Sequence, residues 1–234
     1  MSDLQAAAKK AVGAHVASLI TDGMALGIGT GSTAAMAIEA LGSRIANEGL
    51  KVKGVATSFA AERLARQHGI ELTTLDEIPD LDLAFDGADE VDPDFVLIKG
   101  RGAAQTREKI VASRAKQFVV LVDESKIVDQ LGHRMPLPIE VVPMAVTPIM
   151  QVVRQLGAQA EIRMGMKKDG PVVSDQGMWI VDAMFDGITE PEHVNDVLLK
   201  TPGVVDHGLF IGLATKVLVG RSDGTVQVLD RAAG

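Results

Sequence analysis

Three segments of the sequence place glycines beside residues that can bind an anion or transfer a proton. The first, Gly29-Thr30-Gly31-Ser32-Thr33, joins an apolar strand to a helix. Glycines let the backbone approach a ligand closely, and a helix start offers free N–H groups and the positive end of its dipole. The loop therefore indicates a phosphate site, with a tight turn that binds no ligand as the alternative.

The residues around this loop narrow the kind of phosphate that it could bind. A dinucleotide fingerprint needs a glycine at Ser32 and an acidic residue after the second strand, where the chain has Ala56-Thr57-Ser58. A nucleotide P-loop needs a lysine, and this loop has none. A sugar phosphate needs neither feature and is the ligand that fits best.

The second segment is acidic: Asp86-Gly87-Ala88-Asp89-Glu90-Val91-Asp92 follows the apolar strand Leu81–Phe85. Ligands of parallel sheets bind at the carboxyl ends of the strands. Four carboxylates there could bind a divalent metal, transfer protons or recognise hydroxyls, and a solvated acidic loop is the alternative. No metal is expected, because the five histidines show no ligand spacing; they are His15, His68, His133, His193 and His207.

The third segment, Ile98-Lys99-Gly100-Arg101-Gly102, leads into a helix expected over Ala103–Ala115 that carries Glu108. The helical neighbours of Glu108 carry no charge; they are Ala104, Gln105, Val111 and Ala112. We therefore expect this glutamate to be partly buried, which raises the pKa of a carboxylate and makes it a better base. A surface glutamate between two basic neighbours is the alternative.

Strands that alternate with helices predict a doubly wound, mostly parallel, Rossmann-like α/β sheet. We expect five strand ends of this sheet to converge on one pocket, and Lys126 follows the last of them. The five strands are Met24–Ile28, Lys51–Ala56, Leu81–Phe85, Phe95–Ile98 and Phe118–Val122.

A smaller second domain is expected after Met135-Pro136-Leu137-Pro138, which interrupts the alternation. The order strand, helix, strand, strand, helix, strand over residues 133–208 predicts a ferredoxin-like α+β domain, whose last strand is Val204–Phe210. Thr215–Val219 and Thr225–Leu229 read as a hairpin that returns to the first sheet. The catalytic domain would then comprise residues 1–132 plus 209–234.

Composition excludes several functional classes. The net charge of −8 and the 3% aromatic content disfavour nucleic-acid binding. No apolar run is long enough to span a membrane, and the first residues lack the order of a signal peptide. The chain has 0 cysteines, which excludes disulfides and fits a reducing cytoplasm. We expect a soluble cytoplasmic protein.

An anion loop, two aspartates, two lysines and a carboxylate base suit proton abstraction next to a carbonyl. The base would take a proton from C2 of an open-chain aldose, a cis-enediolate would form, and the proton would return at C1. Three other functions stay open: a non-catalytic sugar-phosphate sensor, a coenzyme A transferase and a structural module of an oligomer.

These motifs together resemble ribose-5-phosphate isomerase of the A type, and they occur in order over nearly the whole chain. Besides the glycine loop and Asp86-Gly87-Ala88-Asp89-Glu90, the resemblance is carried by the motifs Lys99-Gly100-Arg101-Gly102-Ala103-Ala104, Thr106-Arg107-Glu108-Lys109, Leu137–Val141, Pro202–Val205 and Gly208–Phe210.

The resemblance implies interconversion of D-ribose 5-phosphate and D-ribulose 5-phosphate in the pentose phosphate pathway, with no metal or coenzyme cofactor. It implies that Glu108 is the base, that Asp86 assists ring opening, and that Asp89 and Lys99 hold the reacting hydroxyls. Lys9 would lie near the phosphate. The implied substrate-binding residues are Thr30, Gly31, Ser32, Thr33, Asp86, Gly87, Ala88, Asp89, Lys99, Gly100, Arg101, Gly102 and Lys126.

The resemblance also implies a homodimer or homotetramer assembled through the ferredoxin-like domain. At one position the chain departs from the family pattern, which usually has glycine where this chain has Arg101. The side chain of Arg101 must therefore either point away from the pocket or narrow it.

Overall fold

The computed structural model describes residues 3–231, which fold into two compact units. Unit 1 comprises residues 3–88, 107–127 and 213–231, and unit 2 comprises residues 89–106 and 128–212. Each unit has a hydrophobic core of its own.

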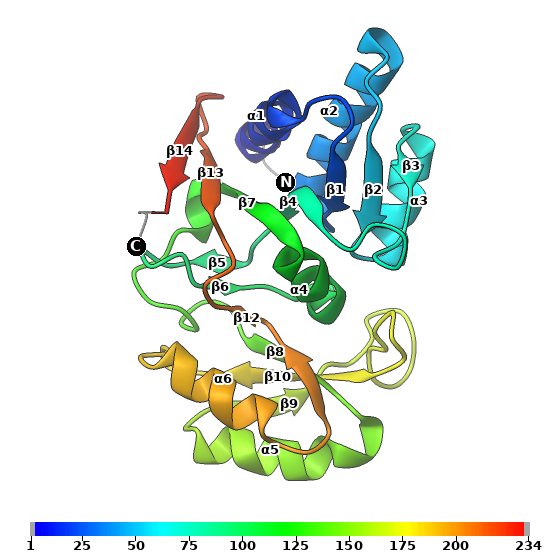
Figure 1. Cartoon of the computed structure of the whole chain (residues 1–234). Helices are drawn as coiled ribbons and strands as arrows, with labels where there is room; N and C mark the ends of the chain where they lie inside the picture. Colours follow the sequence, from blue (N-terminus) through cyan, green and yellow to red (C-terminus); the bar gives the residue numbers. More distant parts are fainter. Residues whose placement is uncertain (1–2, 232–234) are drawn as a thin grey trace. The chain divides into compact units, whose positions relative to one another are not determined.

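Unit 1 is built on a seven-stranded sheet in the order β14-β13-β7-β4-β1-β2-β3, parallel except for the β13–β14 pair (Figure 1). Its strands are β1 (Ala25–Ile28), β2 (Lys53–Ala56), β3 (Glu71–Leu72), β4 (Leu81–Gly87), β7 (Ala115–Asp123), β13 (Lys216–Gly220) and β14 (Val226–Asp230). Its helices are α1 (Asp3–Leu19), α2 (Ser32–Glu48), α3 (Phe59–Gln67), α4 (Gln105–Ser113, from Arg107 onward) and the 3-10 turn η1 (Glu124–Lys126).

Helices cover both faces of this sheet, which confirms the doubly wound architecture. Leu26 and Phe85 point to one face, where they share a core with Ile38 of α2 and further apolar residues of α1 and α3. Successive strand residues alternate between faces, so Gly27 points to the other face. A Cβ at Gly27 would lie 2.5 Å from Val111 Cγ1, so α4 packs directly on that face.

Unit 2 contains a four-stranded antiparallel sheet in the order β11-β8-β10-β9. With two helices between its strands, this is the expected ferredoxin-like unit (Figure 1). Its elements are β8 (Leu137–Val141), η2 (Pro143–Ala145), α5 (Val146–Gln155), β9 (Gln159–Ile162), β10 (Trp179–Met184), α6 (Pro191–Leu199) and β11 (Val204–His207).

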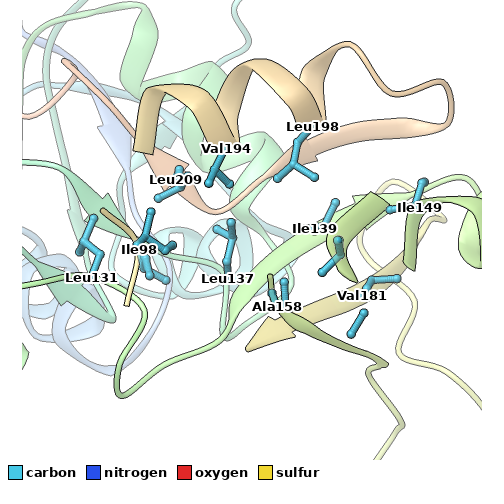
Figure 2. Close-up of a cluster of buried hydrophobic side chains, with 14 of the residues drawn as sticks. Ile98, Leu131, Leu137, Ile139, Ile149, Ala158, Val181, Val194, Leu198 and Leu209 are labelled. Atoms are coloured by element: carbon cyan, nitrogen blue, oxygen red, sulfur yellow. The ribbon is translucent and has the colours of Figure 1, made fainter. Parts of the chain in front are cut away.

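Both helices of unit 2 pack on the same face of its sheet. Figure 2 shows Ile149 of α5 and Leu198 of α6 gathered with Ile139 of β8 and Val181 of β10, and all four side chains are fully buried. Burying one such side chain stabilises a fold by about 1.5–3 kcal/mol. By strand alternation, Glu140 and Asp182 point to the face away from α5 and α6.

The prediction that the strand Phe95–Ile98 belongs to the parallel sheet is wrong. Its ordered part, β6 (Leu97–Ile98), lies between β5 (Glu90–Val91) and β12 (Leu209–Phe210) in a separate antiparallel sheet of three strands. Phe95 lies outside the strand, because its φ of 63° puts it in a turn and its N–H donates to the Asp92 carbonyl. Lys99 therefore does not follow a strand of the seven-stranded sheet.

The expected strand Val204–Phe210 is divided at Gly208 between two sheets. β11 belongs to the four-stranded sheet and β12 to the three-stranded one. Gly208 donates its N–H to the Pro138 carbonyl and accepts from the Lys99 N–H, and a Cβ there would lie 2.1 Å from the Lys99 carbonyl oxygen. Only glycine fits this crossing.

The compact units also have other bounds than the domains expected from the sequence, 1–132 plus 209–234 and 133–208. Residues 89–106 belong to unit 2 because β5 and β6 pair with each other and with β12. Val96 and Ile98 also join the core of that unit. The Pro-rich crossing is shorter than expected, since β8 already begins at Leu137. The returning hairpin is confirmed: β13 pairs with β7 in parallel.

Within residues 3–231, no helix combines the length and apolarity needed to cross a bilayer.

Asp92 shapes the turn between β5 and β6. Its Oδ1 accepts from the N–H groups of Asp94 at 3.0 Å and Val96 at 2.8 Å. Burial raises the pKa of its carboxyl, and the nearby carboxylates of Asp94 and Glu192 raise it further. A carboxyl with a raised pKa stabilises the fold most when protonated, below the pKa of the unfolded chain, and this contribution is lost as pH rises through the folded pKa.

We predict that Asp92→Asn raises the melting temperature at pH 7 by about 1–3 °C. The amide oxygen of asparagine can accept the same two turn hydrogen bonds. The amide carries no charge, so the cost of partly burying the carboxylate is removed. Because the pKa of the Asp92 carboxyl is raised, the difference from the wild type should shrink as the pH falls and the aspartate becomes protonated. Melting curves at pH 4, 5.5 and 7 test this. A variant less stable at pH 7 would show that the hydrogen bonds to the charged carboxylate outweigh the cost of burying it.

Candidate active site

The glycine loop lies where β1 and β4 end side by side in unit 1. Ile28 is opposite Phe85 in the parallel ladder. A Cβ at Gly29 would lie 2.4 Å from the Phe85 carbonyl oxygen and 2.5 Å from Asp86 Oδ1, so this position requires glycine. Gly31 precedes α2 with a φ of 100°, and no side chain caps the helix start. The first N–H groups of α2 are therefore available to an anion.

Hydroxyl groups surround this loop. Thr30 Oγ1 lies 2.7 Å from Thr57 Oγ1 and 2.7 Å from Ser58 Oγ. Ser32 is exposed, and Lys9 Nζ donates to its Oγ at 3.0 Å. Lys9 therefore lies beside the loop. The loop combines backbone donors, hydroxyls and a cation, which is the donor set of a phosphate site.

Sequence reasoning missed Thr57 and Ser58 as members of this cluster. Both are buried, and Ser58 also caps α3 by accepting from the Ala61 N–H. Their signal was available in the sequence, since two hydroxyl residues end a strand of a parallel sheet. They were read only as evidence against a dinucleotide.

Asp86 is 2% exposed at the end of β4, beside the glycine loop. Its Oδ1 accepts from the N–H groups of Thr30 at 2.9 Å and Gly87 at 2.7 Å. The carboxylate thus fixes the loop while lying at the strand end. Gly87 and Ala88 follow half-buried, and Lys126 is half-buried at the end of η1, after the neighbouring strand β7.

Glu108 is 6% exposed on α4, so the expected burial is confirmed and the surface alternative is wrong. The preceding residue, Arg107, points to the end of β2. Its guanidinium lies 5.1 Å from the centre of the Phe59 ring and donates to the Ala56 carbonyl at 3.4 Å. These contacts attach the first turn of α4 to the end of β2, where Thr57 and Ser58 begin.

Unit 2 brings Asp89 close to Lys99 and the loop that follows it. The Asp89 N–H donates to the Ile98 carbonyl at 2.8 Å, and Asp89 Oδ2 accepts from the Arg101 N–H at 3.0 Å. The Lys99 side chain is 3% exposed, and its Nζ lies 5.4 Å from the centre of the Phe210 ring. Asp89 and Lys99 therefore lie on neighbouring backbone segments of this unit.

The side chain of Arg101 lies at the surface of unit 2, beside Asp89. Its side chain is 73% exposed, and Nε lies 3.9 Å from Asp89 Oδ1. The adjoining loop is tightly formed, because Gly100 has a φ of 106° and Ala103 a φ of 58°. Gly102 is exposed, with nothing within 4 Å of a Cβ placed there.

The expected cluster of four carboxylates is only partly formed. Glu90 is 1% exposed and accepts from the N–H groups of Gly132, Arg134 and Met135. Asp92 accepts from two turn N–H groups, as described above. Both are therefore structural, which leaves Asp86 and Asp89 for chemistry. In the part of the chain that the structure describes, no three histidine, aspartate or glutamate side chains are placed to hold a metal ion.

Comparison with known proteins decides the family. Residues 53–224 match the family model described as ribose 5-phosphate isomerase A (phosphoriboisomerase A). The chain is 52% identical to the ribose-5-phosphate isomerase A of Gloeothece citriformis, with 94% of each chain covered. The chain belongs to the ribose 5-phosphate isomerase A family.

Solved structures of this family agree with that assignment. The ribose 5-phosphate isomerase A of Methanocaldococcus jannaschii matches with a TM-score of 0.91 and 46% identity, over 95% of this chain and 98% of that one. A D-ribose-5-phosphate isomerase in complex with phospho-erythronic acid matches with a TM-score of 0.92 and 44% identity, over 96% and 98%. The expected class of enzyme, an aldose-ketose isomerase, is confirmed.

We predict that Gly29→Ala lowers the isomerase activity about 100-fold, because Asp86 must move to admit the methyl group. The added strain should also cost about 1–3 kcal/mol of stability. Gly42→Ala is the matched control: its Cβ would lie 2.6 Å from His68 Cβ and 2.8 Å from the His68 carbonyl oxygen, in a crowded position on α2. Steady-state rates and melting curves of both variants test this. Equal losses of activity would show that Gly29 acts only through stability.

Proposed function

We propose that this enzyme interconverts D-ribose 5-phosphate and D-ribulose 5-phosphate through a cis-enediolate, with Glu108 as the general base, in the pentose phosphate pathway. The family names the substrate. The roles of the individual residues follow the family resemblance and are supported by their burial and contacts in this chain.

The phosphate end of the substrate binds at the glycine loop of unit 1. Backbone N–H groups at the start of α2, the hydroxyls of Thr30, Ser32 and Thr33, and the Lys9 ammonium group are its donors. Lys126 supplies a further cation beyond the end of β7. The phospho-erythronic acid in the solved relative is itself a phosphate ester of a polyhydroxy acid, which supports a ligand of this class.

Asp86 first assists opening of the sugar ring by proton transfer. The Glu108 carboxylate then removes the proton from C2 of the open-chain aldehyde, and the electron pair of that bond forms the C1–C2 double bond of the enediolate. The carbonyl oxygen O1 becomes the oxyanion. Glu108 returns the proton to C1, the proton of the C2 hydroxyl passes to O1, and C2 becomes the ketone carbon.

Asp89 and Lys99 hold the oxygens at C1 and C2 during this transfer. A lysine ammonium group in a buried setting stabilises the enediolate oxygen more strongly than it would in water.

The observation that carries the proposal is the burial of three charged side chains in the family's motifs: Asp86 at 2%, Lys99 at 3% and Glu108 at 6% exposure. Burying charge is costly, so it concentrates at sites where it serves chemistry. A sugar-phosphate sensor would not require a buried carboxylate base.

We predict that Glu108→Gln lowers the rate of ribulose 5-phosphate formation about 10²–10⁴-fold, the contribution of one general base. The assay is run in EDTA, where the wild type should stay fully active. Glu39→Gln, at an exposed position on α2, is the control and should have the wild-type rate.

Two outcomes would contradict parts of this proposal. If the Glu108→Gln enzyme were active, the role of general base would be assigned to Asp86 or Asp89 instead. Loss of wild-type activity in EDTA, restored by a divalent cation, would refute the metal-free mechanism.

We also propose that the enzyme assembles as a homodimer or homotetramer through unit 2. In this unit Met144 is 90% exposed and Met166 is fully exposed, so both apolar side chains are accessible to a partner subunit. We predict that Met144→Lys combined with Met166→Lys weakens assembly at least about tenfold. Light scattering over a dilution series tests this, and a wild type that is monomeric at micromolar concentration would refute it.

A further inference from the structure

The side chain of Arg163 makes four hydrogen bonds that link two parts of unit 2. Arg163 follows β9 directly, and its Nε donates to Asp182 Oδ2 at 2.7 Å while Nη2 donates to Asp182 Oδ1. Its Nη1 donates to the carbonyl oxygens of Gly100 at 2.8 Å and Arg101 at 3.0 Å. The guanidinium therefore joins β10 to the loop that follows Lys99.

The ion pair between Arg163 and Asp182 fixes the orientation of the Arg163 guanidinium group. Its two side chains are only 15% and 19% exposed, and the contact is bidentate. A bidentate arginine–carboxylate pair sets the orientation of the guanidinium plane, and partial burial reduces its screening by water. Asp182 itself lies on a central strand, on the face away from α5 and α6.

The loop that Arg163 contacts has an unusual backbone. Gly100 has a φ of 106°, and the non-glycine Ala103 has a φ of 58°, in the left-handed region that side chains rarely adopt. Such conformations persist only where surrounding contacts enforce them. The two carbonyl contacts of Arg163 fall at the first half of this loop.

A series of hydrogen bonds runs from Asp182 to Asp89. Asp182 orients Arg163, Arg163 binds the Arg101 carbonyl, and the Arg101 N–H donates to Asp89 Oδ2 at 3.0 Å. Lys99 is the residue immediately before this loop, and its own N–H is fixed by the Gly208 carbonyl. The orientation of Asp89 therefore depends on the position of the loop.

The same face of the sheet contacts the segment a second time. Glu140 of β8 is 1% exposed and accepts from the hydroxyls of Thr106 and Ser174. Thr106 lies at the other end of the segment that begins at Lys99. The segment is thus attached at both ends, and Arg163 supplies the attachment nearer to Asp89.

We propose that Arg163 is a positioning residue for the isomerisation, which fixes the 100–102 loop so that Asp89 and Lys99 meet the reacting oxygens. This inference rests on the proposed function. The proposed phosphate contacts belong to unit 1 and do not involve Arg163. Loss of Arg163 should therefore lower kcat while leaving KM nearly unchanged.

The test compares Arg163→Ala, Arg163→Lys and Asp182→Asn with a matched control, Arg44→Ala. Arg44 also binds two backbone carbonyls, those of Ala17 and Ile20 at 2.6 Å each, and one carboxylate, that of Glu48. It does so at the end of α1. Steady-state kinetics with ribose 5-phosphate, melting curves and rescue by guanidinium chloride are measured for each variant.

We expect Arg163→Ala to lower kcat about 10–100-fold with a change in KM below about threefold, and Arg44→Ala to lose stability but keep kcat. Millimolar guanidinium should restore part of the kcat of Arg163→Ala, and the same concentration of sodium chloride should not. Arg163→Lys and Asp182→Asn should show smaller losses of kcat.

Three results would overturn the inference: a wild-type kcat in folded Arg163→Ala, an equal loss of kcat in Arg44→Ala, or a loss confined to KM. If Arg163→Ala does not fold, folded Arg163→Lys carries the test, and a wild-type kcat there refutes the inference. An inactive wild type would instead refute the proposed function, so the two failures are distinguishable.

Discussion

The contact between Asp86 and the glycine loop fixes the structure of unit 1 where β1 and β4 end. One carboxylate oxygen accepts from Thr30 and Gly87, and no atom larger than hydrogen fits on Gly29 beside it. A buried carboxylate is stable only when its hydrogen bonds are made, so the loop and the end of β4 fix each other. In the proposed mechanism the start of α2 binds the phosphate and Asp86 acts on the sugar ring, so one rigid element would hold both groups of the substrate.

In unit 2 a different set of contacts fixes the loop of residues 99–103. This loop lies outside the large parallel sheet, after a strand of only two residues, and has left-handed backbone at Gly100 and Ala103. Regular pairing cannot position such a segment. Side chains of the four-stranded sheet contact it instead, through Arg163 at one end and Glu140 at the other. A domain expected to serve assembly thereby also supports the loop that carries Lys99.

The sequence correctly predicted the features that depend on residues close together in the chain. The doubly wound sheet, the ferredoxin-like order and the burial of Glu108 follow from periodicity and from the residues around each position. Sequence patterns could not reveal that Leu97–Ile98 pairs with two short antiparallel strands, because pairing partners of two-residue strands leave no periodic signal. The contacts of Arg163 were equally hidden, since the arginine is 62 residues from Arg101 and no local pattern marks it. The structural use of Glu90 also depends on distant backbone, residues 132–135.

The return of the chain to its first sheet has a consequence for the order of folding. β13 pairs in parallel with β7, and Val217 is opposite Val120 across nearly a hundred residues of intervening chain. Unit 1 is therefore assembled from three stretches, and its last two strands belong to the third. Contacts of such long sequence separation form slowly, because loop closure must precede them. Until those strands dock, one long side of β7 is an open edge, a template for pairing with another chain, so a slow or truncated C-terminus exposes the molecule to aggregation.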